Sequence, residues 1–301
     1  MLVTHTMGDA TGERGIMRAE NLWWPFGAHI WHVALAKIHA RRRGLRLYYR
    51  RNDCALFPRG EVEHYFEPFG DVTDAEVEAA AASGTLVHHL ADDNIARGYV
   101  PDGYGDIRAY HAEVLRSVFR PSPRIAALLS EHRFLAAVRA LGGRYIAMHI
   151  RWGDKVAGAS RETEMVDVGV YLDLCAAGRA RSGVNALVVC ADTVDGVDAV
   201  VRRNAEGGYG FDVVFDAEET RPENDWTKSF VERVRHRDPA LTPERMELEY
   251  LTCFSIMHIL IECEALVGNY DSLMCMIPAK IRNRPDRDAC VTGRAGRWDN
   301  A

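Results

Sequence analysis

Short apolar runs alternate with longer helix-like segments along most of this 301-residue chain, and this alternation limits its fold more than any other feature. Patterns typical of strands occupy residues 45–49, 85–88, 145–150, 186–190, 211–215 and 265–267. Patterns typical of helices occupy residues 27–43, 71–82, 107–119, 122–141, 168–181, 195–203 and 243–261, and another helix follows Asn269. Strands that alternate with helices are typical of βαβ units and a parallel sheet. The sequence therefore predicts an α/β fold.

Helix-breaking residues divide the chain near its middle. Pro121 and Pro123 stand at the start of the helical pattern of residues 122–141, and Gly142 and Gly143 follow it. The next strand pattern begins at once, so the alternation starts again there. Domain boundaries usually fall in such Pro- and Gly-rich stretches. We expect one domain over residues 1–140 and a second over residues 141–301.

The charge of the chain argues against a nucleic-acid partner. Its formal net charge is -6 at pH 7, whereas nucleic-acid-binding domains are basic. The first residues are polar where a secretory signal would be apolar, and the most apolar region, residues 250–261, is shorter than the roughly 20 residues of a membrane span. Seven cysteines without a C-x-x-C pair favour reduced, buried thiols. We expect a soluble, cytoplasmic protein.

Several signatures of catalysis and metal binding are absent from the sequence. The chain contains no G-x-x-x-x-G-K-[ST], H-E-x-x-H or G-x-S-x-G motif, which argues against P-loop, zincin and esterase chemistry. His29 and His32 lie one helical turn apart, but no third ligand follows at a readable spacing. Asp286 and Asp288 form a D-x-D in a charged tail, which we expect to cover a surface. The sequence therefore predicts no metal site.

The strongest candidate site follows the apolar run of residues 145–150. His149, Arg151, Asp154 and Lys155 gather at the end of this predicted strand. The carboxyl ends of parallel strands open into the ligand crevice of α/β sheets. Arg presents a planar fork of donors that matches a phosphate, and His can bond a base or a phosphate oxygen. A diphosphate site is one interpretation, and a surface salt-bridge group is the other.

Two more predicted strands end in polar residues. Residues 186–190 lead to Asp192 and Thr193. The strand at residues 265–267 leads to a polar stretch that we expect to cap the following helix, namely Asn269, Tyr270, Asp271 and Ser272. An anion could bind at the N-terminus of that helix. Three polar strand ends in one parallel sheet predict a crevice.

These segments resemble the motifs of a known family. HIRWGDKV resembles the H-x-R-x-x-D-K-V motif of the α1,6-fucosyltransferases and their bacterial nodulation relatives. VVCADT is similar to the second motif of that family and LVGNYDSLMCM to the third, in the same order and at similar spacing. Upstream, PFGAHIWHVALAKIHARRRGLRLYY resembles the glycine loop and first helix of the family, and VEHYFEP resembles the segment that closes that unit.

The resemblance implies a GT-B fold, in which two Rossmann-like domains with parallel sheets face each other across a cleft. Residues 1–140 would form the acceptor-side domain and residues 141–301 the domain that binds the nucleotide sugar. The reaction implied is inverting, metal-independent transfer of L-fucose from GDP-β-L-fucose to a hydroxyl of a glycan acceptor. GDP-fucose would be a co-substrate, and no cofactor is implied.

The resemblance also assigns roles to individual residues. Arg151 would hold the β-phosphate and neutralise charge as GDP leaves, and His149 would contact the nucleotide. Lys155 would lie beside the reacting hydroxyl, and Glu162, or else Glu164, would take the acceptor proton as general base. The remaining implied roles are donor binding by Gly27, Ala28, Tyr270, Asp271 and Ser272, contact with acceptor or fucose by Asp192, Lys155 and Glu164, and structural support by Asp154.

Three positions depart from the family pattern. Trp152 stands where the family usually has a second arginine, Gly153 where it has threonine, and Asp271 where it has serine. These changes remove one cation and add one anion near the expected diphosphate. They leave open a GT-B enzyme that uses another nucleotide sugar. A glycan- or nucleotide-binding module without catalysis also stays open, if neither Glu162 nor Glu164 points into the cleft.

Overall fold

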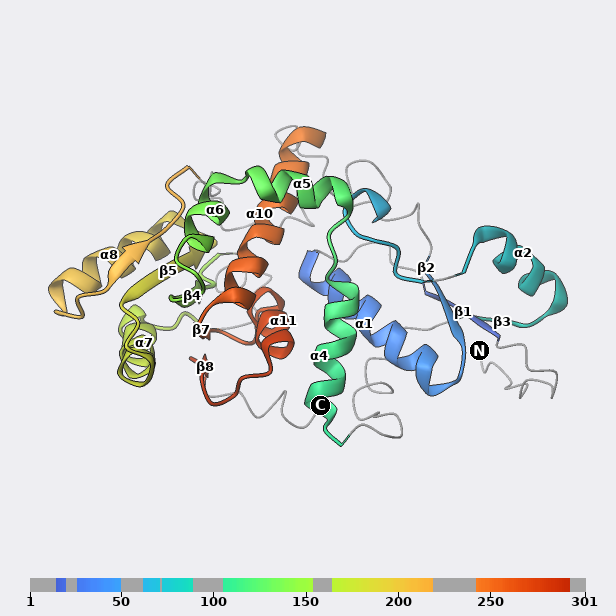
Figure 1. Cartoon of the computed structure of the whole chain (residues 1–301), viewed down its shortest axis with the longest axis horizontal. Helices are drawn as coiled ribbons and strands as arrows, with labels where there is room; N and C mark the ends of the chain where they lie inside the picture. The colour runs from blue at the N-terminus through green and yellow to red at the C-terminus, as the bar shows by residue number, and fades with distance from the viewer. Residues whose placement is uncertain are drawn as a thin grey trace.

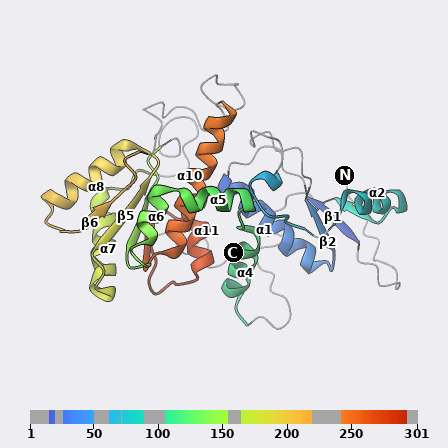
Figure 2. The same cartoon turned by 45° about the horizontal axis from the view of Figure 1, so that its top comes forward.

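The computed structural model of the chain describes residues 15–19, 26–49, 62–70, 72–88, 105–153, 164–218 and 242–292. Within these residues, two parallel sheets lie toward opposite ends of the long axis of the molecule, with a layer of helices between them (Figure 1). The view in Figure 2 shows the same separation. The predicted α/β class with parallel sheets is confirmed.

The first sheet has the strand order β2-β1-β3, and all its described pairings are parallel. Its strands are β1 (Ile16–Ala19), β2 (Arg46–Tyr49) and β3 (Leu86–His88). The central strand β1 was not predicted, because its four residues follow a polar, Gly-rich stretch. The crossovers contain α1 (Phe26–Arg42), the 3-10 turn η1 (Val62–His64) and α2 (Asp74–Ser83).

The second sheet has the strand order β6-β5-β4-β7-β8 and is also parallel. Its strands are β4 (Ile146–Ile150), β5 (Ala186–Ala191), β6 (Asp212–Val214), β7 (Ala265–Gly268) and β8 (Ala289–Cys290). The chain builds outward from β4 in one direction, then returns to add β7 on its other side. The strand order thus reverses between β4 and β7, and ligands of open α/β sheets bind beyond the carboxyl ends of strands at such a point.

Helices cover both faces of the second sheet. On one face, α7 (Val168–Ser182) and α8 (Val194–Glu206) pack in a core with β4 and β5. The helices α10 (Pro243–Glu262) and α11 (Leu273–Arg282) belong to the larger core that reaches the first sheet. The helix α10 is the apolar helix expected over residues 243–261, and its buried residues include Phe254, Met257 and Leu260.

Three shorter helices connect the two halves: α4 (Ile107–Val118), α5 (Pro123–Glu131) and α6 (Arg133–Arg139). The prediction of one continuous helix over residues 122–141 is wrong. His132 takes an extended backbone conformation between α5 and α6, and its Nδ1 accepts a hydrogen bond from the amide of Leu135 at 3.3 Å. The side chain of His132 thus caps α6 and separates the two helices.

The larger core is continuous between the two sheets. The ring of Phe254 on α10 lies 4.7 Å from that of Phe26 on α1 and 4.9 Å from that of Phe66. The ring of Phe119 stacks on the ring of Phe254, with the ring centroids 5.7 Å apart. Because residues of both halves share this aromatic cluster, burial links the two halves. The domain division at residue 140 stays a prediction.

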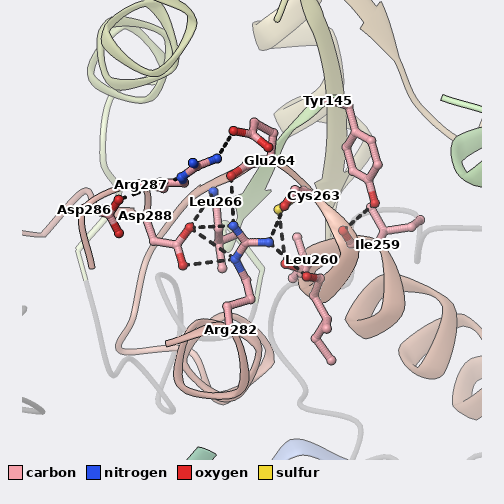
Figure 3. Close-up of polar contacts among 11 residues, drawn as sticks. Tyr145, Ile259, Leu260, Cys263, Glu264, Leu266, Arg282, Asp286, Arg287 and Asp288 are labelled. Carbon is pink, nitrogen blue, oxygen red and sulfur yellow. Dashed lines mark hydrogen bonds and ion pairs between the residues drawn. The ribbon is translucent and has the colours of Figure 1, made fainter. Parts of the chain in front are cut away.

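The charged tail after residue 283 was expected to cover a surface, but part of it is buried. Asp288 accepts hydrogen bonds from the guanidinium of Arg282, with the shortest contact at 2.9 Å, and the two side chains are 5% and 2% exposed (Figure 3). Arg282 also donates to the carbonyls of Ile261, Cys263 and Glu264. This buried pair holds the tail beside the turn between α10 and β7, and β8 follows directly.

Candidate functional site

The candidate site lies at the carboxyl ends of β4 and β7, where the strand order reverses. His149 is paired in register with Gly268, so these neighbouring strands end together. The polar stretch that starts at Asn269 then leads into α11, whose first residue is Leu273. Arg151 follows β4 by one residue. The structure thus brings two of the three predicted polar strand ends to one place.

His149 is a buried, neutral group at this edge. It is 5% exposed, and its Nδ1 has no hydrogen-bond partner among the described residues. Burial lowers the pKa of His149 to about 3, with a further contribution from the charge of Arg151. A Cβ at Gly268 would lie 3.3 Å from the Cβ of His149 and 2.4 Å from Cys275 Sγ on α11. The glycine therefore lets α11 approach the sheet closely beside His149.

Arg151 and Asp192 join the ends of β4 and β5. Arg151 Nη1 lies 2.7 Å from Asp192 Oδ2, and the side chains are 25% and 17% exposed. The neighbouring Thr193 accepts a hydrogen bond from the amide of Gly196 and so caps α8. The third predicted strand end, after β5, therefore contributes the carboxylate of an ion pair to the site. Arg151 follows β4, which lies between β5 and β7 in the sheet.

The N-termini of two helices from different halves of the chain meet near this edge. Gly27 lies in the first turn of α1. A Cβ added there would lie 3.1 Å from the Cβ of Leu273 and 3.5 Å from the amide nitrogen of Met274, so the two helices approach closely. Ala28 beside it is buried. The backbone amides at the start of a helix and the helix dipole both favour an anion. A phosphate group could therefore use both helices.

The start of α11 lacks the expected side-chain cap. Ser272 occupies the N-cap position, but its side chain makes no capping hydrogen bond. The amide of Asp271 donates to Asn269 Oδ1 at 2.9 Å, which shapes the turn before the helix. Tyr270 is largely buried, and in the described part of the chain its hydroxyl has no hydrogen-bond partner; burial raises the pKa of Tyr270. The side chain of Ser272 therefore does not cap α11.

The segment expected to carry the general base is only partly described. Asp154, Lys155 and Glu162 lie outside the described residues. Glu164 is described and exposed. The indole nitrogen of Trp152 donates to the carbonyl of Val166 at 3.2 Å, so the chain before Asp154 is bonded to the chain after Glu162.

Sequence reasoning missed Gly268 and Cys275, which set how closely α11 packs against the sheet. The close approach of Gly268 to Cys275 depends on how α11 packs on the sheet, and no local sequence pattern predicts this packing. Among the described residues, no group of three His, Cys, Asp or Glu side chains could hold a metal ion. In the same part of the chain, no helix has the length and apolar character needed to cross a bilayer.

Solved structures of fucosyltransferases are similar to this chain at low sequence identity. NodZ α1,6-fucosyltransferase soaked with GDP-fucose is 13% identical, with a TM-score of 0.48, over 89% of this chain and 93% of that one. POFUT1 in complex with GDP-fucose is 12% identical, with a TM-score of 0.45, over 94% of this chain and 99% of that one. A mutant of Arabidopsis thaliana FUT1 in complex with GDP is 10% identical, with a TM-score of 0.50, over 92% of this chain and 70% of that one.

The comparison with protein-family models gave no match, and neither did the comparison with curated proteins. The likeness to FUT1 shows that the two chains share a fold, at an identity too low to show more. The NodZ crystal was soaked with GDP-fucose, and POFUT1 was solved in complex with GDP-fucose.

Proposed function

We propose that this protein is a fucosyltransferase that moves L-fucose from GDP-β-L-fucose to a hydroxyl of a glycan acceptor, with inversion and without a metal. One observation carries the proposal. Arg151 stands beside the strand-order reversal of a parallel sheet, where the N-termini of α1 and α11 also converge. A cation and two helix N-termini form a favourable environment for a diphosphate. The resemblance in sequence motifs and in fold supports GDP-fucose as the donor.

In this proposal Arg151 neutralises the charge that develops on the β-phosphate as the bond from phosphate oxygen to fucose breaks. Fixed positive charge at a leaving group is a major source of transition-state stabilisation. His149 has a neutral imidazole at neutral pH, because its pKa is about 3, so it would bond the nucleotide without adding charge. The other proposed donor contacts are Gly27, Ala28, Tyr270, Asp271 and Ser272.

The acceptor half of the reaction needs a base on the opposite face of the fucose. We propose Glu162 for this role, with Glu164 as the alternative, and Lys155 as the group that orients the reacting hydroxyl. The base would take the hydroxyl proton as the acceptor oxygen attacks the anomeric carbon. Asp154 would support the loop. The acceptor would lie in a cleft between residues 1–140 and residues 141–301.

A related enzyme that uses another nucleotide sugar is the second candidate. The observation that favours it is the environment of Trp152, which stands where the family usually has a second arginine. Its indole bonds Val166, so this position brings no second cation to the diphosphate. Thermal-shift measurements with GDP, UDP and dTDP separate the two candidates. A ligand at 100 times its Kd stabilises a protein by about 2.7 kcal/mol, and stabilisation by UDP alone would favour the second candidate.

The proposal is tested by measuring GDP release from GDP-fucose with a panel of glycan acceptors. We expect acceptor-dependent release by the natural protein and a loss of at least about 100-fold in Arg151→Ala. Arg144→Ala is the matched control, because Arg144 is exposed and precedes the amino end of β4. Binding of GDP without acceptor-dependent release would instead support a non-catalytic module, and full activity of Arg151→Ala would refute the role of Arg151.

A further inference from the structure

Three donors converge on the carboxylate of Asp192. Arg151 Nη1 and the amide of Gly153 donate to Oδ2 at 2.7 Å and 2.9 Å. The amide of Trp152 donates to Oδ1 at 2.8 Å. In addition, the amide of Asp192 lies 3.4 Å from the carbonyl of Ile150, the last residue of β4. One aspartate at the end of β5 is thus bonded to four consecutive residues at the end of β4.

The backbone at Gly153 is built around this carboxylate. A Cβ at Gly153 would lie 2.6 Å from Asp192 Oδ2, closer than real side-chain carbons approach an oxygen. A carboxylate held by three donors cannot move aside without losing hydrogen bonds. The glycine at this position, where the related motif has threonine, is therefore matched to the position of Asp192. An ordinary surface salt bridge has neither backbone donors to the carboxylate nor a glycine fitted against it. Their presence indicates that the structure holds Asp192 in a defined position.

The contacts of Asp192 constrain where the guanidinium of Arg151 lies. Arg151 has a long side chain with several rotatable bonds, and a partner fixed by two backbone amides restricts them. Groups that orient a binding residue in this way raise its effectiveness, because the residue no longer has to be ordered when the ligand arrives. With the carboxylate 17% exposed and both oxygens bonded, little of Asp192 remains for a ligand.

We propose that Asp192 is a positioning residue, which acts on the nucleotide diphosphate through Arg151 and the turn at Trp152 and Gly153. This inference rests on the proposed function, since it assumes that Arg151 binds the diphosphate. It assigns Asp192 a different part from the acceptor or fucose contact that the motif resemblance implies. A third possibility is that the carboxylate competes with the phosphate for Arg151, and the test separates all three.

The test is a double-mutant cycle on GDP affinity, measured by titration calorimetry with the natural protein, Asp192→Ala, Arg151→Ala and the double variant. We expect Asp192→Ala to weaken GDP binding by about tenfold or more, because misplaced binding groups lose much of their effect. In the Arg151→Ala background the same change should have almost no effect. Asp195→Asn is the control, because it removes an exposed carboxylate three residues away on α8.

Steady-state kinetics separate positioning from contact with the acceptor. For Asp192→Ala we expect a higher KM for GDP-fucose and a lower kcat, with the KM for the acceptor unchanged. Asp192→Asn keeps the shape and one acceptor oxygen, so it should fall between the natural protein and Asp192→Ala. A purely structural role would lower the folded fraction and leave both KM values unchanged.

Three results would overturn the inference. Tighter GDP binding by Asp192→Ala would mean that the carboxylate competes with the phosphate. A higher KM for the acceptor, or an equal loss in the Arg151→Ala background, would mean that Asp192 acts directly on a ligand. If the natural protein does not bind GDP at all, the proposed function fails and this role fails with it. Even then, hydrogen exchange at the amides of Trp152 and Gly153 would show whether the turn depends on Asp192. Faster exchange in Asp192→Ala than in the natural protein would mean that it does.

Discussion

At the scale of single residues, the carboxylate of Asp192 holds the residues that follow β4 through bonds to Arg151, Trp152 and Gly153. His149 and Arg151 could be predicted as polar groups at a strand end, because their position after an apolar run is a local pattern. The bonds of Asp192 join residues that are far apart in the sequence: Arg151 and Asp192 are separated by 41 positions. No local pattern carries such a contact.

Gly153 should be sensitive to the smallest enlargement. In Gly153→Ala, the added Cβ would overlap Asp192 Oδ2, so the carboxylate or the turn has to move. We expect GDP affinity to fall by about tenfold, as in Asp192→Ala. Gly105→Ala is the control, because Gly105 is exposed and its added carbon would meet no described atom within 4 Å. Equal GDP affinity in both variants, measured by calorimetry, would show that the turn has more freedom than the contacts indicate.

Buried neutral histidines should make the fold sensitive to mild acid. Burial, with the charge of His32, lowers the pKa of His29 from 6.5 to about 3. Between these two pH values the unfolded chain binds a proton that folded His29 does not, so stability rises with pH and is lost as pH falls below 6.5. The slope is at most about 1.4 kcal/mol per pH unit for each such histidine.

The measurement is the free energy of unfolding in urea between pH 4 and 7, for the natural protein and for His29→Gln. We expect a smaller slope in the variant, since glutamine has no proton to gain. The control is His132→Gln at a half-buried histidine, because glutamine keeps an acceptor for the cap of α6. Identical slopes in all three proteins would contradict neutral burial of His29.

At the scale of elements, caps and glycines marked the helix ends well where the signal was local. Thr73 and Glu76 form the capping box of α2, and Gly84 ends that helix at a φ of 72°. The break between α5 and α6 was not predicted, because it depends on His132 in place of a proline or glycine. The strand β8 was missed because its charged surroundings resemble an exposed tail, whereas Asp288 beside it is neutralised by buried Arg282.

The buried pair of Arg282 and Asp288 should matter greatly for stability. Removal of one partner leaves a buried charge, so Asp288→Ala should cost about 3 to 5 kcal/mol of the free energy of unfolding. Arg287→Ala is the control, because the pair of Arg287 with Glu264 is exposed and should contribute no more than about 1 kcal/mol. Chemical denaturation measures both values. A cost for Asp288→Ala as small as that of the control would contradict the structural role of the pair.

At the scale of the whole molecule, the alternation of strands and helices was enough to predict an α/β fold with parallel sheets. It could not predict that α10 links the two sheets through Phe254, because the partners Phe26, Phe66 and Phe119 come from distant parts of the chain. The same limit applies to the meeting of α1 and α11 at Gly27 and Leu273. Contacts between elements determine the geometry of the site, and local sequence patterns predict such contacts poorly.

Shared burial between the halves should make unfolding cooperative. Phe254 is fully buried, and Phe254→Ala should cost about 3 to 5 kcal/mol through lost burial and the cavity left behind. We expect circular dichroism and tryptophan fluorescence to report one coincident denaturation transition in both the natural protein and the variant. Two separated transitions in the natural protein would instead show that residues 1–140 and 141–301 unfold independently.

The most direct test of the account is a crystal structure of the protein with GDP. We predict density for the diphosphate in contact with Arg151 and with the first turn of α11, with Gly27 of α1 beside it. The guanidinium should keep its bond to Asp192 in that complex. Density for GDP away from the carboxyl ends of β4 and β7, or a diphosphate that Arg151 does not contact, would contradict the central claim.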